Sequence, residues 1–189
     1  VLLVTGGLVT LARSIRPADR ATIAAPAPTA AAAAPAPAPT TSRPAARLTL
    51  AFAGDVHFAD RTAARLSADP DTAFGEAATA LRAADLTMVN LETAVTERGS
   101  PEPKEFHFRT PATAFTALRA AGVDVATMAN NHAADYGAVG LSDTLAAIKS
   151  TRFPTIGIGA DAGRAYAPYY VTVRGHRVAP PAAPRRRVS

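Results

Sequence analysis

The apolar positions of this chain fall into two patterns that alternate from residue 47 onward. Short continuous apolar runs, which are typical of buried strands, occupy residues 48–53, 86–89, 123–129, 154–158 and 169–173. Apolar residues at helical spacing predict three helices, over residues 73–84, 111–121 and 141–149. Strands that alternate with helices in this way favour an α/β fold with a largely parallel sheet and helices on its faces.

Three of the predicted strands run directly into polar side chains. These are Asp55 and His57 after the first strand, Asn90 and Glu92 after the second, and Asn130, Asn131 and His132 after the third. Because the carboxyl ends of parallel strands lie side by side, we expect these side chains to form one cluster. Asp, Glu, Asn and His supply the donors that a pair of divalent metal ions needs. The alternative for the third group is that its residues only cap the following helix.

A long segment without a clear pattern, residues 93–110, separates the second strand from the second predicted helix. Loops of this length beside a site are often lids or substrate-binding elements, and we expect that role here. His107 lies between Phe106 and Phe108, where a single histidine is more often structural or solvated than catalytic.

The first 46 residues do not have the composition of a core. Residues 1–13 are mostly apolar, and we interpret them as a signal anchor or signal-peptide remnant, although the apolar run is shorter than the roughly 20 residues that span a bilayer. A frayed terminus of a cytosolic protein is the alternative. Residues 14–46 are rich in Ala and Pro and predict a disordered linker. We therefore expect either a domain tethered to the cell membrane on its extracytoplasmic face or a secreted protein.

Composition and charge narrow the classes of function. The chain has no cysteine, which excludes disulfides and thiolate metal sites. Its net charge of +5 is not arranged for nucleic acid, because Arg185, Arg186 and Arg187 lie in a Pro-rich tail and the other basic residues are scattered. We therefore expect no nucleic-acid partner.

Several sequence blocks carry a resemblance to a known family. They are Gly54-Asp55, Asn90-Leu91-Glu92-Thr93, Ala129-Asn130-Asn131-His132, Asp135-Tyr136-Gly137, Gly140-Leu141 and Thr144-Leu145. Over residues 47–179 the chain resembles the CapA family of poly-γ-glutamate capsule biosynthesis proteins, a branch of the calcineurin-like metallophosphoesterase superfamily.

The resemblance implies a four-layer αββα fold with a two-metal site at the carboxyl ends of the strands. Asp55 and His57 match the first metal-binding motif, and Glu92, with Asn90 beside it, takes the place of the bridging carboxylate. Asn131 matches the metal-ligating Asn, and His132 matches the histidine that assists the leaving group. The implied cofactors are divalent ions such as Mn, Zn, Fe or Mg, which activate water and clamp a phosphoryl group when they lie about 3.5–4 Å apart.

The chain departs from the family pattern near its carboxyl end. CapA-like proteins continue into strands whose motifs, similar to HWG and GHHPH, supply further histidine ligands, whereas residues 180–189 are rich in Pro and Arg. We therefore expect residues 47–179 to be the N-terminal part of the domain and residues 180–189 to be an aberrant tail. The sandwich and the metal coordination would then be incomplete.

Three functions compete at this point. The first is a membrane-anchored, CapA-like component of capsule or poly-γ-glutamate biosynthesis and export, with a metallophosphatase-type site. The second is a calcineurin-like metal-dependent phosphoesterase, and the third is a catalytically inert fragment or binding module. The expected partners are an anionic polymer or phosphate-containing substrate, the membrane through the N-terminus, and other capsule-synthesis proteins.

Overall fold

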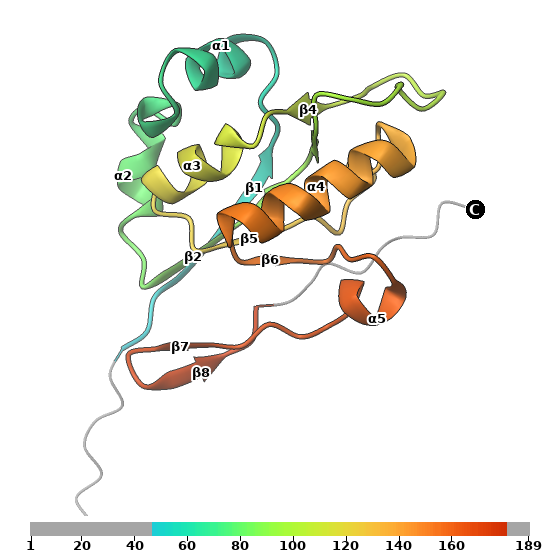
Figure 1. Cartoon of the computed structure of the whole chain (residues 1–189). Coiled ribbons are helices and arrows are strands. Elements are labelled where there is room, and N and C mark those ends of the chain that lie inside the picture. The colour runs from blue at the N-terminus through green and yellow to red at the C-terminus, as the bar shows by residue number, and fades with distance from the viewer. Residues whose placement is uncertain (1–46, 181–189) are drawn as a thin grey trace, which may run out of the picture. The chain divides into compact units, whose positions relative to one another are not determined.

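The computed structural model describes residues 47–180 (Figure 1). Its elements, in chain order, are β1 (Leu50–Val56), α1 (Asp60–Ala68), the 3₁₀ turn η1 (Pro70–Thr72), α2 (Ala77–Leu81), β2 (Leu86–Leu91), β3 (Ala94–Val95), β4 (Arg109–Thr110), α3 (Thr113–Ala120), β5 (Val125–Thr127), α4 (Gly137–Thr151), β6 (Thr155–Ile156), α5 (Ala162–Ala165), β7 (Val171–Val173) and β8 (His176–Val178). The segments predicted over 1–13, 14–46 and, apart from Pro180, 180–189 lie outside the described residues. Within residues 47–180, no helix has both the length and the apolar character to cross a bilayer.

Four parallel strands form the main sheet in the order β1-β2-β5-β6, which confirms the predicted α/β fold with a parallel sheet. Asp55 on β1 is in register with Asn90 on β2, and Asn90 is in register with Thr127 on β5. The register of β1 shifts between Phe52 and Asp55, as it does at a β-bulge, which re-aims the following side chain. Because the strands run the same way, the residues that follow them gather at one edge of the sheet.

Helices α1 to α4 pack on one face of this sheet and form the larger core (Figure 1). Phe115 and Leu118 of α3 are completely buried there, against Val89 and Leu91 of β2. Burying an apolar side chain of this size stabilises the fold by about 1.5–3 kcal/mol. The helices therefore hold β2, which carries Asn90 at its end, in a fixed position.

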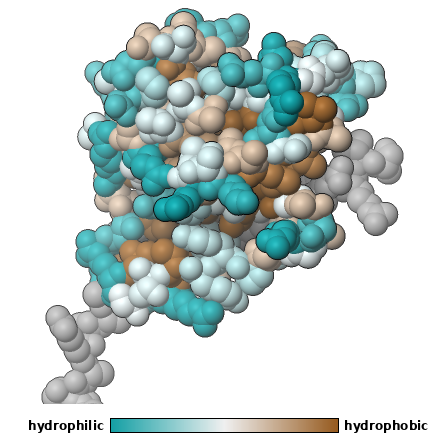
Figure 2. Space-filling model, viewed as in Figure 1, coloured by the Kyte–Doolittle hydropathy of each residue, from teal (hydrophilic) through white to brown (hydrophobic). Residues whose placement is uncertain are grey.

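The opposite face of the sheet is covered by the β7–β8 hairpin, which contributes to a second, smaller core. Val171, Val173 and Val178 of the hairpin pack against Leu86, Met88, Val125 and Ile156 of the sheet. Figure 2 shows the apolar, brown atoms of this region among polar, teal ones. Phe52, which is in register with Met88 on β2, remains 58% exposed. The hairpin thus covers this face in part, and the four-layer arrangement stays a prediction.

Three parts of the chain differ from the sequence pattern. Helix α1 was not predicted, because Leu66 is its single buried side chain and leaves no helical periodicity to read. The helix predicted over 73–84 is shorter, because a 3₁₀ turn precedes α2. The segment 93–110 contains the two-residue strands β3 and β4, which pair in parallel and fix both ends of the loop.

Candidate functional site at the carboxyl ends of the strands

A line of amides and carboxylates crosses the edge of the sheet. Asn90, at the end of β2, donates from Nδ2 to Asp55 Oδ1 on β1 at 2.7 Å. Asn130, which follows β5, donates from Nδ2 to Asn90 Oδ1 and to the carbonyl of Leu91, both at 2.9 Å. Three strand ends are therefore joined through side chains, as the parallel register requires.

Glu92 lies beside this line, one residue after β2. Its backbone N–H donates to the carbonyl of Val56 at 2.9 Å, which extends the β1–β2 pairing and fixes the start of its side chain. Burial raises the pKa of the Glu92 carboxyl, the negative charge of Asp55 raises it further, and the imidazoles of His132 and His57 act in the opposite direction. The four groups therefore share one electrostatic environment at these strand ends.

His132 is the buried member of the group, with 8% of its surface exposed. Its backbone N–H donates to Asn130 Oδ1 at 3.0 Å, and its ring Nδ1 lies 2.8 Å from Asp135 Oδ2. The other ring nitrogen, Nε2, lies 3.9 Å from Glu92 Oε1. His132 therefore has one nitrogen held by a buried carboxylate and one directed toward the polar edge of the sheet.

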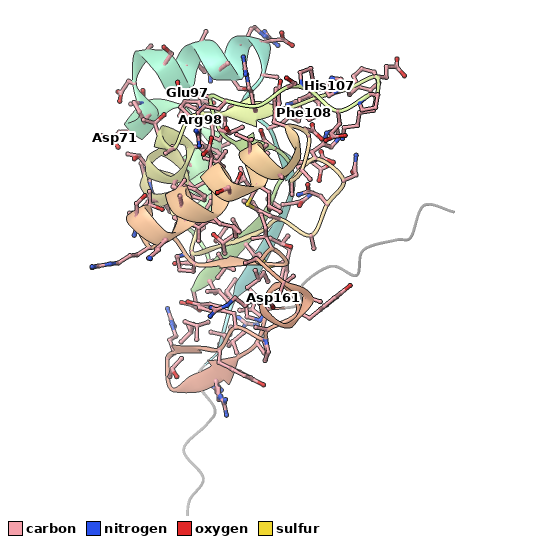
Figure 3. The ribbon with its side chains drawn as sticks, turned by 45° about the vertical axis from the view of Figure 1, so that its right-hand side comes forward. Asp71, Glu97, Arg98, His107, Phe108 and Asp161 are labelled. Atoms are coloured by element: carbon pink, nitrogen blue, oxygen red, sulfur yellow. The ribbon has the colours of Figure 1, made fainter. Side chains whose placement is uncertain are left out.

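The loop predicted as a lid contributes to the site through Phe108 and Lys104. The phenyl ring of Phe108 stacks on His57, with centroids 4.4 Å apart, and contacts the ring of His132, with centroids 4.6 Å apart. Lys104 forms an ion pair with Asp135 and donates to the carbonyl of Asn131 at 2.9 Å. His107, labelled beside Phe108 in Figure 3, contacts the carbonyl of Glu102 within the loop itself, as expected for a structural histidine.

Asn131 lies apart from this network. Its side chain is exposed and lines a hollow of about 450 Å³ between the loop after β5 and the segment from Gly157 to Tyr166. In Figure 3 Asp161, which also lines that hollow, lies well away from Phe108. The neighbouring Asn130 makes the contacts at the strand ends, whereas the resemblance had singled out Asn131 as the metal-ligating residue.

A second hollow, of about 440 Å³, opens beside the exposed ends of Asp55 and His57. The first two turns of α1 form its wall, with Arg61 and Arg65 among the lining residues. Solvent and a small ligand can therefore approach the site from the β1–α1 side.

The donors at this edge fit a divalent cation in their chemistry. Asp55 and Glu92 are carboxylates close enough to repel one another, and a cation between them would relieve that repulsion. Within residues 47–180, however, no three His, Asp or Glu side chains converge at metal-ligand spacing. The donor types fit, a complete ligand set is not assembled among these residues, and the role of a metal stays a prediction.

Comparison with known proteins gives a family. The sequence profile of the bacterial capsule synthesis protein family PGA_cap matches residues 49–186. The chain is also 36% identical over 128 residues to the probable polyglutamine synthesis accessory proteins of two Mycobacterium tuberculosis strains, CDC 1551 / Oshkosh and ATCC 25618 / H37Rv. The match covers 65% of this chain and 33% of each relative, so it spans about a third of their length. Since the family profile covers most of the described residues and the predicted site, the chain belongs to the bacterial capsule synthesis protein family PGA_cap.

Proposed function

We propose that this chain is part of a poly-γ-glutamate capsule synthesis protein that binds a divalent cation at the edge of the sheet and acts on a phosphate-containing or anionic polymer substrate. The observation that carries the proposal is the convergence of Asp55, Glu92 and His132 in a member of this family. The mycobacterial relatives are named as probable polyglutamine synthesis accessory proteins, which supports a role in the synthesis of a related polymer. Attachment to the extracytoplasmic face of the membrane and contact with other capsule-synthesis proteins belong to the same proposal.

The residues take different roles in this scheme. Asp55 and Glu92 would hold the cation, with His57 and Asn90 as further donors, and the Asn131 side chain would have to turn from the separate hollow to join them. When bound, a divalent ion supplies positive charge that neutralises phosphoryl oxygens. In its doubly protonated form, His132 would deliver the Nε2 proton to the leaving oxygen and keep the Nδ1–H bonded to Asp135, because Nε2 faces Glu92 and Nδ1 is held by Asp135.

The proposal includes the αββα layering of the metallophosphoesterases. The helices on one face would be an outer layer, and the β hairpin on the other face would be part of the second sheet. The exposed Phe52 lies where the rest of that sheet would pack. The parallel sheet would then be one of the two inner layers.

Turnover of an aryl phosphodiester tests the proposed chemistry. We expect weak binding of Mn²⁺ or Zn²⁺ and slow, metal-dependent turnover, because the described residues do not assemble three ligands. His132→Ala should abolish the turnover, whereas His107→Ala, which alters a histidine whose contact lies within the loop, should retain it. Turnover that persists in His132→Ala or without metal would contradict the proposal, and a chain that binds no metal would be an inert fragment or binding module.

A further inference from the structure

Asp135 is a fully buried carboxylate that is contacted by Lys104 and Phe108 of the segment 93–110 and by His132 of its own loop. Its Oδ2 accepts a hydrogen bond from the backbone N–H of Phe108 at 2.6 Å and lies 2.8 Å from Nδ1 of His132. Its Oδ1 is in contact with the ammonium of Lys104, an ion pair without hydrogen-bond geometry. The buried negative charge is therefore neutralised on one oxygen and hydrogen-bonded on the other.

This arrangement determines where the neutral His132 ring carries its proton. A carboxylate only accepts hydrogen bonds, so Nδ1 must be the donor in its contact with Asp135. Lys104 Nζ also lies 3.3 Å from Nδ1, but it donates to the carbonyl of Asn131 at 2.9 Å and pairs by charge with Asp135. The lone pair is consequently on Nε2, the atom 3.9 Å from Glu92 Oε1.

The geometry points to Asp135 and Lys104 as positioning residues that act through His132. Asp135 fixes the Nδ1–H tautomer and the orientation of the ring, as a carboxylate does for other active-site and metal-binding histidines. Lys104 neutralises Asp135 and engages Oδ1, which reserves Oδ2 for the imidazole and for the loop backbone. The use of Nε2 rests on the proposed function, whereas the tautomer itself is a property of the folded chain.

Replacement of Asp135 by Asn creates a conflict that reveals the role of Lys104. If the amide oxygen takes the position of Oδ2, the amide nitrogen faces the ammonium of Lys104, and two donors meet. If the amide oxygen instead faces Lys104, the amide nitrogen meets the backbone N–H of Phe108, which is also a donor, and it can donate to Nδ1 of His132 only if the ring proton moves to Nε2. Removing the ammonium in a Lys104→Met background allows the first orientation, which restores the Nδ1–H tautomer.

Nitrogen chemical shifts of the imidazole rings test this inference. Long-range ¹H–¹⁵N spectra would be recorded on the ¹⁵N-labelled chain with a chelator present, at a pH where the rings are neutral, and His132 assigned by its loss in His132→Gln. We expect Nδ1–H in the wild type and in Lys104→Met, a partial or complete loss of the Nδ1–H form toward Nε2–H in Asp135→Asn, and return to Nδ1–H in the double variant.

An Nε2–H tautomer in the wild type, or an unchanged Nδ1–H signal in folded Asp135→Asn, would overturn the inference. If Asp135→Asn does not fold, the wild type and Lys104→Met still test the inference, because both retain the Asp135 carboxylate. A change of tautomer in Lys104→Met would contradict the assignment. Metal binding and turnover are measured separately. The predicted tautomer in a chain without either would refute the proposed function and leave the positioning role intact.

Discussion

Asn130 joins the end of β2 to the loop that carries His132. One amide nitrogen donates to Asn90 Oδ1 and to the carbonyl of Leu91, and its oxygen accepts from the His132 backbone N–H. The adjacent Asn131 is exposed. The resemblance assigned Asn131 to the metal site. The strand pattern itself could not choose between the two neighbours, because the period-two rule for side-chain direction ends where the strand ends.

Asn130→Asp should lower the free energy of unfolding by about 1–3 kcal/mol, because a carboxylate cannot donate and leaves two acceptors without their partner. Asn131→Asp introduces the same charge at an exposed position and should change that free energy by less than about 0.5 kcal/mol. Urea denaturation of both variants, without added metal, measures the difference. Equal losses would show that Asn130 does not link the strand ends.

At the scale of elements, the segment 93–110 is tied to helix α4 by a side-chain cluster. Asp143 of α4 accepts from Thr96 Oγ1 at 2.6 Å and from Arg98 Nε at 3.0 Å, and Arg98 is labelled in Figure 3. These contacts lower the pKa of the Asp143 carboxyl to about 2, with the Arg98 hydrogen bond as the largest cause. The loop that supplies Lys104 and Phe108 thus begins from a charged anchor.

The pH dependence of stability should show this anchor. Because the pKa of Asp143 is lowered on folding from its ordinary value of 3.8, its contribution is present above pH 3.8 and is lost as the pH falls through about 2. Asp143→Asn should therefore be less stable than the wild type at neutral pH, and the gap should close in acid. Thermal unfolding across this range checks it, with Glu97→Gln as the control for an adjacent exposed carboxylate. A gap that stays constant with pH would contradict the assignment.

At position 157, directly after β6, only glycine fits, because of the backbone conformation there and the close approach of Ala129. Gly157 has a φ of +78°, and a Cβ there would come within 2.5 Å of Ala129 Cβ and 2.8 Å of Ala129 N, just before Asn130. Gly175, in the β7–β8 turn, has a φ of +82° and open space around the same position.

Gly175→Ala should cost about 1–2 kcal/mol, which is the penalty of the left-handed backbone alone. Gly157→Ala should cost clearly more, since backbone atoms of Ala129 must also move. Chemical denaturation measures the free energy of unfolding of the two variants, and the difference between them is the cost of the steric clash with Ala129. If both substitutions had the same effect, the segment around Gly157 would not support the loop after β5.

At the scale of the whole molecule, a parallel sheet with helices on one face brings separate sequence blocks to one edge. The alternation of continuous apolar runs with segments of helical spacing predicted this arrangement. Strands such as β2 and β5 are buried, and a buried parallel strand appears in the sequence as a continuous apolar stretch. The same reasoning predicted that the polar residues after the three strands cluster. In the structure Glu92 lies near His132 and Asp55, whereas the side chain of Asn131 lines a separate hollow. Lys104, Phe108 and Asp135 could not be assigned, because a loop without periodicity gives no indication of where its side chains fold back.

Equilibrium dialysis against Mn²⁺ tests the central claim most directly, since that claim is a cation site formed by the strand ends. The account predicts weak, saturable binding by the full chain, lost at least tenfold in affinity in Asp55→Asn and in Glu92→Gln, which corresponds to about 1.4 kcal/mol. Asp161→Asn, a change in a carboxylate of the separate hollow, should leave the binding unchanged. Equal affinity in Asp55→Asn, Glu92→Gln and the wild type would contradict the account.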